Sequence, residues 1–146
     1  MTLRVFAWVC LCSALTLLSA TLSANEAILT TPGGLKYRDL QVGSGPAATI
    51  GQIAVIHFAG WIDQDGTRGK KLYNSRDRGQ PTSFLIGTDM VMEGWNEGII
   101  GMKPGGRRLL IIPAKLGYGA RGVDGMVPAN ANLIFVIELL KLGAGH

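Results

Sequence analysis

The stretch GWNEGIIGMKPGGRRLLIIPAKLGYGARG, residues 94–122, decides the fold of this chain. It predicts a short helix that carries Trp95, a Pro-Gly-Gly reversal, a buried strand and a glycine-spaced loop that presents Tyr118. A tyrosine between two glycines is poorly placed to fill a core. We therefore expect the segments on either side to build a small apolar pocket around Tyr118.

Composition indicates one globular domain. The chain has 146 residues, of which 47% are hydrophobic and 16% are charged. These values suit a single buried core and exclude a disordered or fibrous chain. All 21 glycines lie from Gly33 onward, which favours tight turns and short strands over a helical bundle.

The N-terminal residues resemble an export signal. Arg4 precedes an apolar run over residues 5–22, and small residues close the run before the first acidic residue, Glu26. We expect a signal peptide over residues 1–24, with four cleavage positions left open: after Ala20, Ser23, Ala24 or Ala27. A retained membrane anchor is the alternative. Cleavage would give an exported, periplasmic protein without stable membrane association, and it would remove both cysteines.

The rest of the chain reads as one α+β domain over residues 35–142, between a flexible leader at 25–34 and a C-terminal tail at 143–146. Alternation and turn signals predict strands over these ranges: 35–40, 53–62, 72–75, 82–86, 107–112 and 133–142. The Asp65-Gly66 pair predicts a hairpin, and helical spacing of apolar residues predicts a helix over residues 91–100. The expected architecture is an antiparallel sheet wrapped over this helix.

Charge and motif spacing exclude several functions. The formal net charge is +4, and the basic cluster from Lys70 to Arg78 is interrupted by Asp77, so we expect no nucleic-acid partner. No His, Cys or carboxylate group has metal-ligand spacing, and no phosphate-binding glycine motif has the right context. We expect neither a metal nor a cofactor.

A hydrolase would depend on His57, because the only other histidine is the last residue. A histidine in the middle of a strand is more often a structural residue than a general base. The sequence shows no organised set of partners around it. The activity expected of this chain is one that needs shape and apolar walls more than proton transfer.

Three motifs together are similar to FKBP-type peptidyl-prolyl cis-trans isomerases: SRDRGQP at residues 75–81, the stretch at 94–122, and PANANLIFVIELLKL at 128–142. The resemblance extends over residues 35–142. It implies a twisted antiparallel sheet of about five strands around one short helix. The activity that it implies is rotation of X-Pro peptide bonds.

The resemblance also implies a site, residue by residue. Trp95 would form the pocket floor, and Phe58 and Phe135 its aromatic walls. The backbone N–H of Met92 and the hydroxyl of Tyr118 would donate hydrogen bonds to substrate carbonyls. Six further pocket residues are implied by the same matching: Leu72, Tyr73, Phe84, Val91, Met126 and Val127.

The chain departs from the family where Phe-Asp-Ser-Ser is usual, because it has Leu72, Tyr73, Asn74 and Ser75. The pocket aspartate of the family is thus replaced by Tyr73. Two hypotheses follow. One is an active isomerase that assists the folding of exported proteins. The other is a proline-pocket binding module or chaperone with weak or no isomerase activity.

The resemblance implies two kinds of partner: proline-containing polypeptides as substrates and macrolide inhibitors of the FKBP class. The chain lacks the long helical dimerisation segment of some exported relatives. We therefore expect a monomer.

Overall fold

A computed structural model describes residues 27–145, so the expected signal peptide lies outside the described residues. Seven strands occur in this part of the chain: β1 (Leu29–Thr30), β2 (Lys36–Gln41), β3 (Gln52–Gln64), β4 (Thr67–Asn74), β5 (Thr82–Leu85), β6 (Arg107–Ile112) and β7 (Leu133–Ala144). They are joined by one α-helix and two short 3-10 helices: α1 (Glu93–Ile99), η1 (Ser75–Arg78) and η2 (Ala114–Leu116). None of the described helices is long and apolar enough to cross a membrane.

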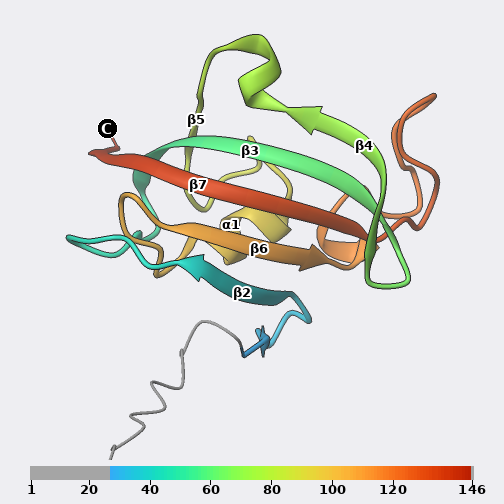
Figure 1. Ribbon diagram of the computed structural model, residues 1–146, viewed down its shortest axis with the longest axis horizontal. Helices are drawn as coiled ribbons and strands as arrows, with labels where there is room; N and C mark the ends of the chain where they lie inside the picture. The colour runs from blue at the N-terminus through green and yellow to red at the C-terminus, as the bar shows by residue number, and fades with distance from the viewer. Residues whose placement is uncertain (1–26, 146) are drawn as a thin grey trace, which may run out of the picture.

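The strands form one antiparallel sheet that curves over α1 (Figure 1). Their order across the sheet is β1-β2-β6-β7-β3-β4, and β5 pairs with the first part of β3. The α+β architecture predicted from the sequence is therefore confirmed. The sheet has seven strands, against about five implied by the resemblance and six ranges predicted from the sequence. The strand that was not predicted is the short β1, which adds a pairing at the margin beside β2.

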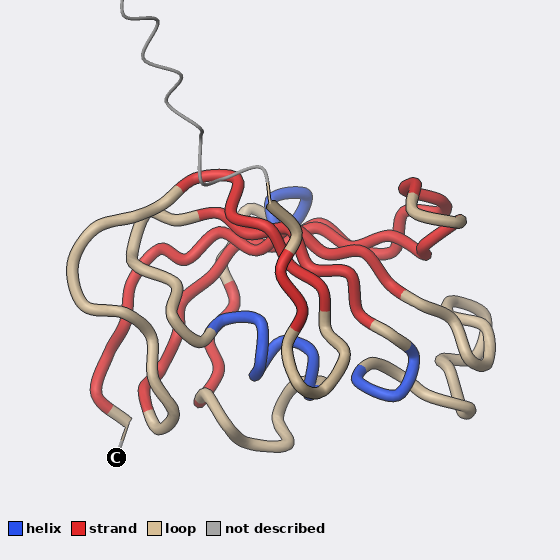
Figure 2. The backbone as a smooth tube through the Cα atoms, turned by 90° about the horizontal axis from the view of Figure 1, so that it is seen from below, coloured by secondary structure: helices blue, strands red, loops and turns tan. Residues whose placement is uncertain are grey.

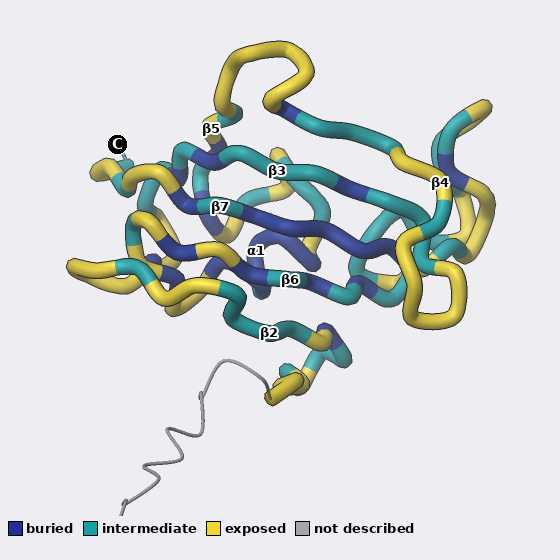
Figure 3. The backbone as a smooth tube through the Cα atoms, viewed as in Figure 1, coloured by how far each residue is buried: buried dark blue, intermediate teal, exposed yellow. Residues whose placement is uncertain are grey.

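The core lies between the concave face of the sheet and α1, and β7 runs through its centre (Figures 2 and 3). Alternate residues of β7 point into this core, and each is at most 1% exposed: Leu133, Phe135, Ile137 and Leu139. These are the residues that the period-two pattern places on one face. The helix approaches β6 closely, since a Cβ at Gly98 would lie 2.6 Å from a methyl of Leu110. Glycine in the helix thus serves close packing.

The observed elements differ from the predicted ones mainly at their ends. The helix is shorter than expected, and β4 begins at Thr67 because the hairpin turn is tight. Asp65 and Gly66 both have positive φ, 52° and 86°, as a type I′ turn requires. At the other end, Ala144 pairs with Gln52 of β3, so β7 includes part of the expected C-terminal tail.

Part of the expected leader is also ordered. β1 pairs with β2. Thr31, which follows β1, makes two hydrogen bonds that hold it in place. Its Oγ1 donates to Glu97 of α1 at 2.9 Å, and its N–H donates to the carbonyl of Leu35. Residues 29–35 therefore form a strap that ties the edge of the sheet to the helix. Residues 25 and 26 lie outside the described part of the chain.

Arg108 of β6 connects the sheet to the end of α1. Its Nε donates to Asp39 at 2.7 Å, and its Nη1 donates to the carbonyls of Gly98 and Ile100 at 3.0 and 2.9 Å. Its guanidinium also lies 4.6 Å from the ring centre of Tyr37. Because these carbonyls end the helix and lack intrahelical partners, Arg108 fixes the position of α1, which carries Trp95.

Candidate functional site

A cavity of about 440 Å³ opens between the concave face of the sheet, α1 and two loops. Its volume lies within the range of small-ligand sites. The residues that line it come from five parts of the chain: Phe58, Tyr73, Arg78, Asp89, Met90, Val91, Met92, Trp95, Gly117, Tyr118 and Phe135. Seven of the eleven residues predicted for the site are among them: Phe58, Tyr73, Val91, Met92, Trp95, Tyr118 and Phe135.

Aromatic rings form the floor and one wall of this cavity. The indole of Trp95 contacts the ring of Phe58 edge-on at 4.6 Å between centres, and that of Phe135 at 5.4 Å. Such edge-to-face pairs fix the relative position of the rings. The indole Nε1–H is buried and has no hydrogen-bond partner within residues 27–145. The floor is thus an apolar surface of packed rings that contains one buried donor without a partner among the described residues, which is rare in folded proteins.

The loop before α1 is held in place by Asn96, which is only 5% exposed. Its Oδ1 accepts from the N–H of Gly87 at 2.8 Å, and its Nδ2 donates to the carbonyl of Thr88 at 2.7 Å. Met92 follows in extended conformation as the residue that precedes the helix. Its carbonyl accepts from the N–H groups of Trp95 and Asn96, and Met92 lines the cavity. N–H groups at the start of a helix have no intrahelical acceptor and can donate to other groups.

Tyr118 lies in the loop between β6 and β7, which is shaped by backbone hydrogen bonds. The N–H of Gly119 donates to Ala114 and that of Gly122 to Tyr118, while Asn130 donates to the carbonyl of Gly119. Burial raises the pKa of the Tyr118 phenol, and the neighbouring Tyr73 raises it further. The hydroxyl therefore stays protonated at neutral pH and remains a hydrogen-bond donor towards the cavity.

Four lining residues were not predicted as site residues: Arg78, Asp89, Met90 and Gly117. Asp89 and Met90 are exposed and directly precede Val91, while Gly117 directly precedes Tyr118. Extending the predicted site by one or two neighbours along the chain would have found these three. Arg78 follows the SRD run and reaches the rim from η1.

The remaining four predicted residues do not line this cavity. Phe84 is 2% exposed and packs behind Trp95, with 5.9 Å between ring centres. Leu72 is partly buried and packs against the core. Met126 and Val127 line a separate hollow beside Ile62, since the bridge between Val123 and Val127 folds their loop back on itself.

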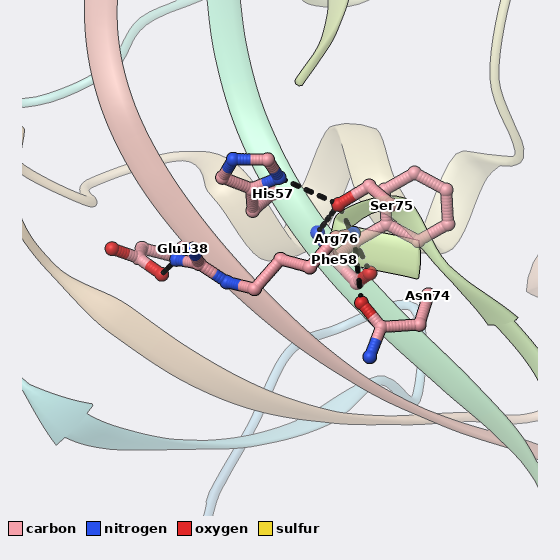
Figure 4. A network of polar contacts seen from close by, with 6 residues as sticks. All are labelled: His57, Phe58, Asn74, Ser75, Arg76 and Glu138. Carbon is pink, nitrogen blue, oxygen red and sulfur yellow. Dashed lines mark hydrogen bonds and ion pairs between the residues drawn. The ribbon is translucent and has the colours of Figure 1, made fainter. Parts of the chain in front are cut away.

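His57 takes part in a structural network on the other side of β3 (Figure 4). Its Nδ1 lies 2.8 Å from Oγ of Ser75, which is fully buried. That Oγ also accepts from the N–H of Phe58 at 2.9 Å and donates to its carbonyl at 3.3 Å. Ser75 thus anchors the strand that carries Phe58, and its buried hydroxyl is not presented to a substrate as a nucleophile would be. Within the described residues, no three or more His, Cys, Asp or Glu side chains form a group that could hold a metal.

Fold and cavity together define a class of protein: a small curved antiparallel sheet packed over a single helix, with a cavity between them that is lined largely by aromatic and apolar side chains. Comparison with known sequences identifies the family. Residues 45–140 match the sequence profile of the FKBP-type peptidyl-prolyl cis-trans isomerases, and the chain belongs to this family.

Curated relatives and solved structures agree with this assignment. The chain is 46% identical over 110 residues to an FK506-binding protein of Neisseria meningitidis serogroup B, covering 75% of this chain and 97% of that protein. It is 43% identical to FK506-binding protein 1A of Neurospora crassa, covering 75% and 88%. FkpA from Escherichia coli superposes with a TM-score of 0.73 at 34% identity, over 86% of this chain and 55% of FkpA. AtFKBP13 gives 0.71 at 35% identity, over 79% and 98%.

Proposed function

We propose that this protein is an active peptidyl-prolyl cis-trans isomerase that assists the folding of exported polypeptides. The observation that carries the proposal is the cavity of about 440 Å³ floored by Trp95. Its walls are aromatic, and both Tyr118 and the Met92 N–H can donate hydrogen bonds at its edge. The chain that contains it belongs to the FKBP family.

Rotation of an X-Pro bond needs no nucleophile. The barrier of about 18 to 20 kcal/mol arises from lost amide resonance, while the cis and trans forms differ by only about 0.5 to 1 kcal/mol. A site therefore accelerates the rotation by binding the twisted amide better than the planar one. Apolar walls also favour the twisted amide, because it has less charge separation than the planar form.

We propose a part for each residue in this reaction. The proline ring would lie on the indole of Trp95, between Phe58 and Phe135. The N–H of Met92 would bind a carbonyl on the C-terminal side of the proline, which orients the substrate chain. The protonated hydroxyl of Tyr118 would bind a second carbonyl and fix the part of the chain that does not rotate.

The export signal predicted from the sequence supports the choice of substrates. A protein that is exported meets chains that fold outside the cytoplasm, where slow X-Pro isomerisation limits folding. We propose a periplasmic location and a monomeric state for the mature protein. Proline-containing segments of unfolded chains are the proposed substrates, and FKBP-directed macrolides are the proposed competitive ligands of the same cavity.

Tyr73 favours a second candidate, a binding module with little turnover. Its side chain lines the cavity at the position where the family usually has aspartate, and its ring lies 6.4 Å from that of Phe58. A tyrosine there adds apolar area and removes a negative charge. It could therefore strengthen binding of the ground state without favouring the twisted amide, which would lower turnover.

The decisive experiment is an isomerisation assay with residues 25–146 on short peptides that vary the residue before proline. Without a catalyst, the cis and trans forms of an X-Pro peptide reach equilibrium in tens to hundreds of seconds. We expect the native chain at micromolar concentration to shorten this time about tenfold or more. An FKBP-directed macrolide should abolish this acceleration. The same chain should speed the refolding of a denatured exported protein whose folding is limited by a cis proline.

Two variants separate the candidate functions. Tyr73→Asp restores the charge usual in the family, and Tyr73→Phe removes only the hydroxyl. If both the native chain and the Tyr73→Phe variant accelerate isomerisation, the protein is an active isomerase. A native chain that binds the peptides but leaves their relaxation unchanged, with turnover only in Tyr73→Asp, would instead identify a binding module.

A further inference from the structure

A second hollow, of about 180 Å³, lies across the sheet from the cavity that holds Trp95. We call it the outer groove, and six of its residues carry the argument: Trp61, Arg68, Arg76, Arg107, Val136 and Glu138. They come from β3, β4, η1, β6 and β7, of which β6, β7 and β3 lie side by side in the sheet (Figure 1). The groove shares only Phe58 with the proline cavity, and its proposed role does not depend on the proposed isomerase activity.

Positive charge dominates the outer groove. Three guanidinium groups face one carboxylate, that of Glu138. Glu138 forms an ion pair with Arg76 (Figure 4), and this leaves Arg68 and Arg107 without an acidic partner among residues 27–145. Both residues are exposed on the solvent side of their strands. The groove therefore has two guanidinium groups whose N–H donors can reach an added anion.

Arg68 is already positioned for such a contact. Its guanidinium carbon lies 4.3 Å from the ring centre of Trp61, a distance typical of a cation–π contact. Stacking on the ring uses the face of the guanidinium and leaves its N–H edges in the plane, where they match the two oxygens of a carboxylate. Because the side chain is held in advance, binding costs less conformational entropy.

The floor and size of the groove indicate what fits. Ala59 and Val136 are opposed across β3 and β7, and they offer a short apolar floor to the methylene groups of an acidic side chain. A volume of about 180 Å³ is below the range of drug-sized ligands. Glu138 adds negative charge at one side, which disfavours a doubly charged phosphate more than a single carboxylate.

We propose that the outer groove binds an acidic segment of a polypeptide, with one Asp or Glu carboxylate engaged by Arg68 and Arg107. The site is distinct from the proline cavity, because Phe58 is the one lining residue that the two hollows share. The affinity of this site for a segment depends on the negative charge of the segment and does not require a proline residue. The protein therefore has a second point of attachment for unfolded or partly folded acidic chains.

Binding of a proline-free peptide tests the proposal without reference to isomerase activity. A fluorescent peptide that alternates Glu and Gly is titrated with residues 25–146 at low ionic strength, and anisotropy is followed. We expect the double variant Arg68→Gln/Arg107→Gln to bind about tenfold more weakly than the native chain. Both positions are exposed, so the thermal unfolding midpoint should fall by no more than a few degrees, from loss of the contact between Arg68 and Trp61.

Two controls separate a built site from general charge attraction. Lys36→Gln/Lys115→Gln removes the same charge from exposed positions outside the groove, and it should weaken binding less than twofold. Trp61→Leu keeps every charge but removes the stacking surface beneath Arg68, and it should weaken binding about threefold. Trp61→Phe retains a ring, and native affinity should return in large part.

Three results would overturn the proposal. One is equal weakening in the lysine and arginine double variants, which would show unspecific attraction. Another is native affinity in Trp61→Leu and in the arginine double variant. The third is displacement of the peptide by equimolar inorganic phosphate, which would assign the groove to small oxyanions.

Discussion

Replacing Gly60 by alanine should lower kcat/KM for X-Pro isomerisation at least about tenfold. Gly60 lies on β3 opposite Phe135 of β7, and a Cβ at this position would lie 2.8 Å from Cζ of the Phe135 ring and closer still to Cε1. The added methyl group must push this ring towards Trp95 and into the cavity. The free energy of unfolding should fall by about 1 to 3 kcal/mol, as is usual when a packed core is overfilled.

Gly143→Ala is the matched control for this change. Gly143 lies on the same strand as Phe135, and the nearest atom to a Cβ there would be 3.9 Å away. We expect no loss of stability and unchanged kcat/KM. Chevron or urea unfolding measures the first quantity and the peptide assay the second. A destabilised Gly60→Ala protein with native kcat/KM would show that the position of Phe135 does not matter to catalysis.

Arg108→Ala should lower the free energy of unfolding by about 3 kcal/mol. The side chain is only 8% exposed and pairs with Asp39, while it also satisfies the carbonyls of Gly98 and Ile100. Removing it leaves a partly buried carboxylate and two helix-end carbonyls without their donor. Since Asp39 keeps some contact with solvent, the loss should lie at the lower end of the range for broken buried pairs.

Arg107→Ala provides the comparison, because this neighbour is exposed and forms no ion pair within residues 27–145. Its loss should change the free energy of unfolding by less than about 0.5 kcal/mol. Urea denaturation of both variants measures the difference. Similar small losses in the two proteins would mean that Arg108 does not hold α1 against the sheet.

The sheet and helix could be predicted from the sequence because their signals are local. Alternation in residues 133–142 correctly placed Leu133 and Phe135 on the buried face, and Asp65-Gly66 correctly marked the hairpin. The exact extent of the sheet was harder to predict. β1 has only two residues, and its pairing depends on contacts of Thr31 with α1 that no local pattern reveals.

The candidate site was predictable where one residue fills one position in the fold, as with Trp95 and Tyr118. Site residues were harder to predict where side-chain packing decides which of two nearby hollows a residue lines. Phe84 and Val127 match pocket positions of the family, yet the first packs beneath Trp95 and the second lines a separate hollow. Arg108 was missed because its partners lie on another strand and at the helix end, far away in sequence.

In the proposed mechanism, the proline ring of a substrate binds on the indole of Trp95. The most direct measurement is a search for intermolecular NOEs between the proline ring protons of a short X-Pro peptide and the indole protons of the protein. Residues 27–145 contain two tryptophans, Trp61 in the outer groove and Trp95 in the cavity. We predict NOEs to Trp95 that vanish when an FKBP-directed macrolide is added. NOEs to Trp61 alone, or contacts that survive the macrolide, would show that the proline ring does not bind on Trp95.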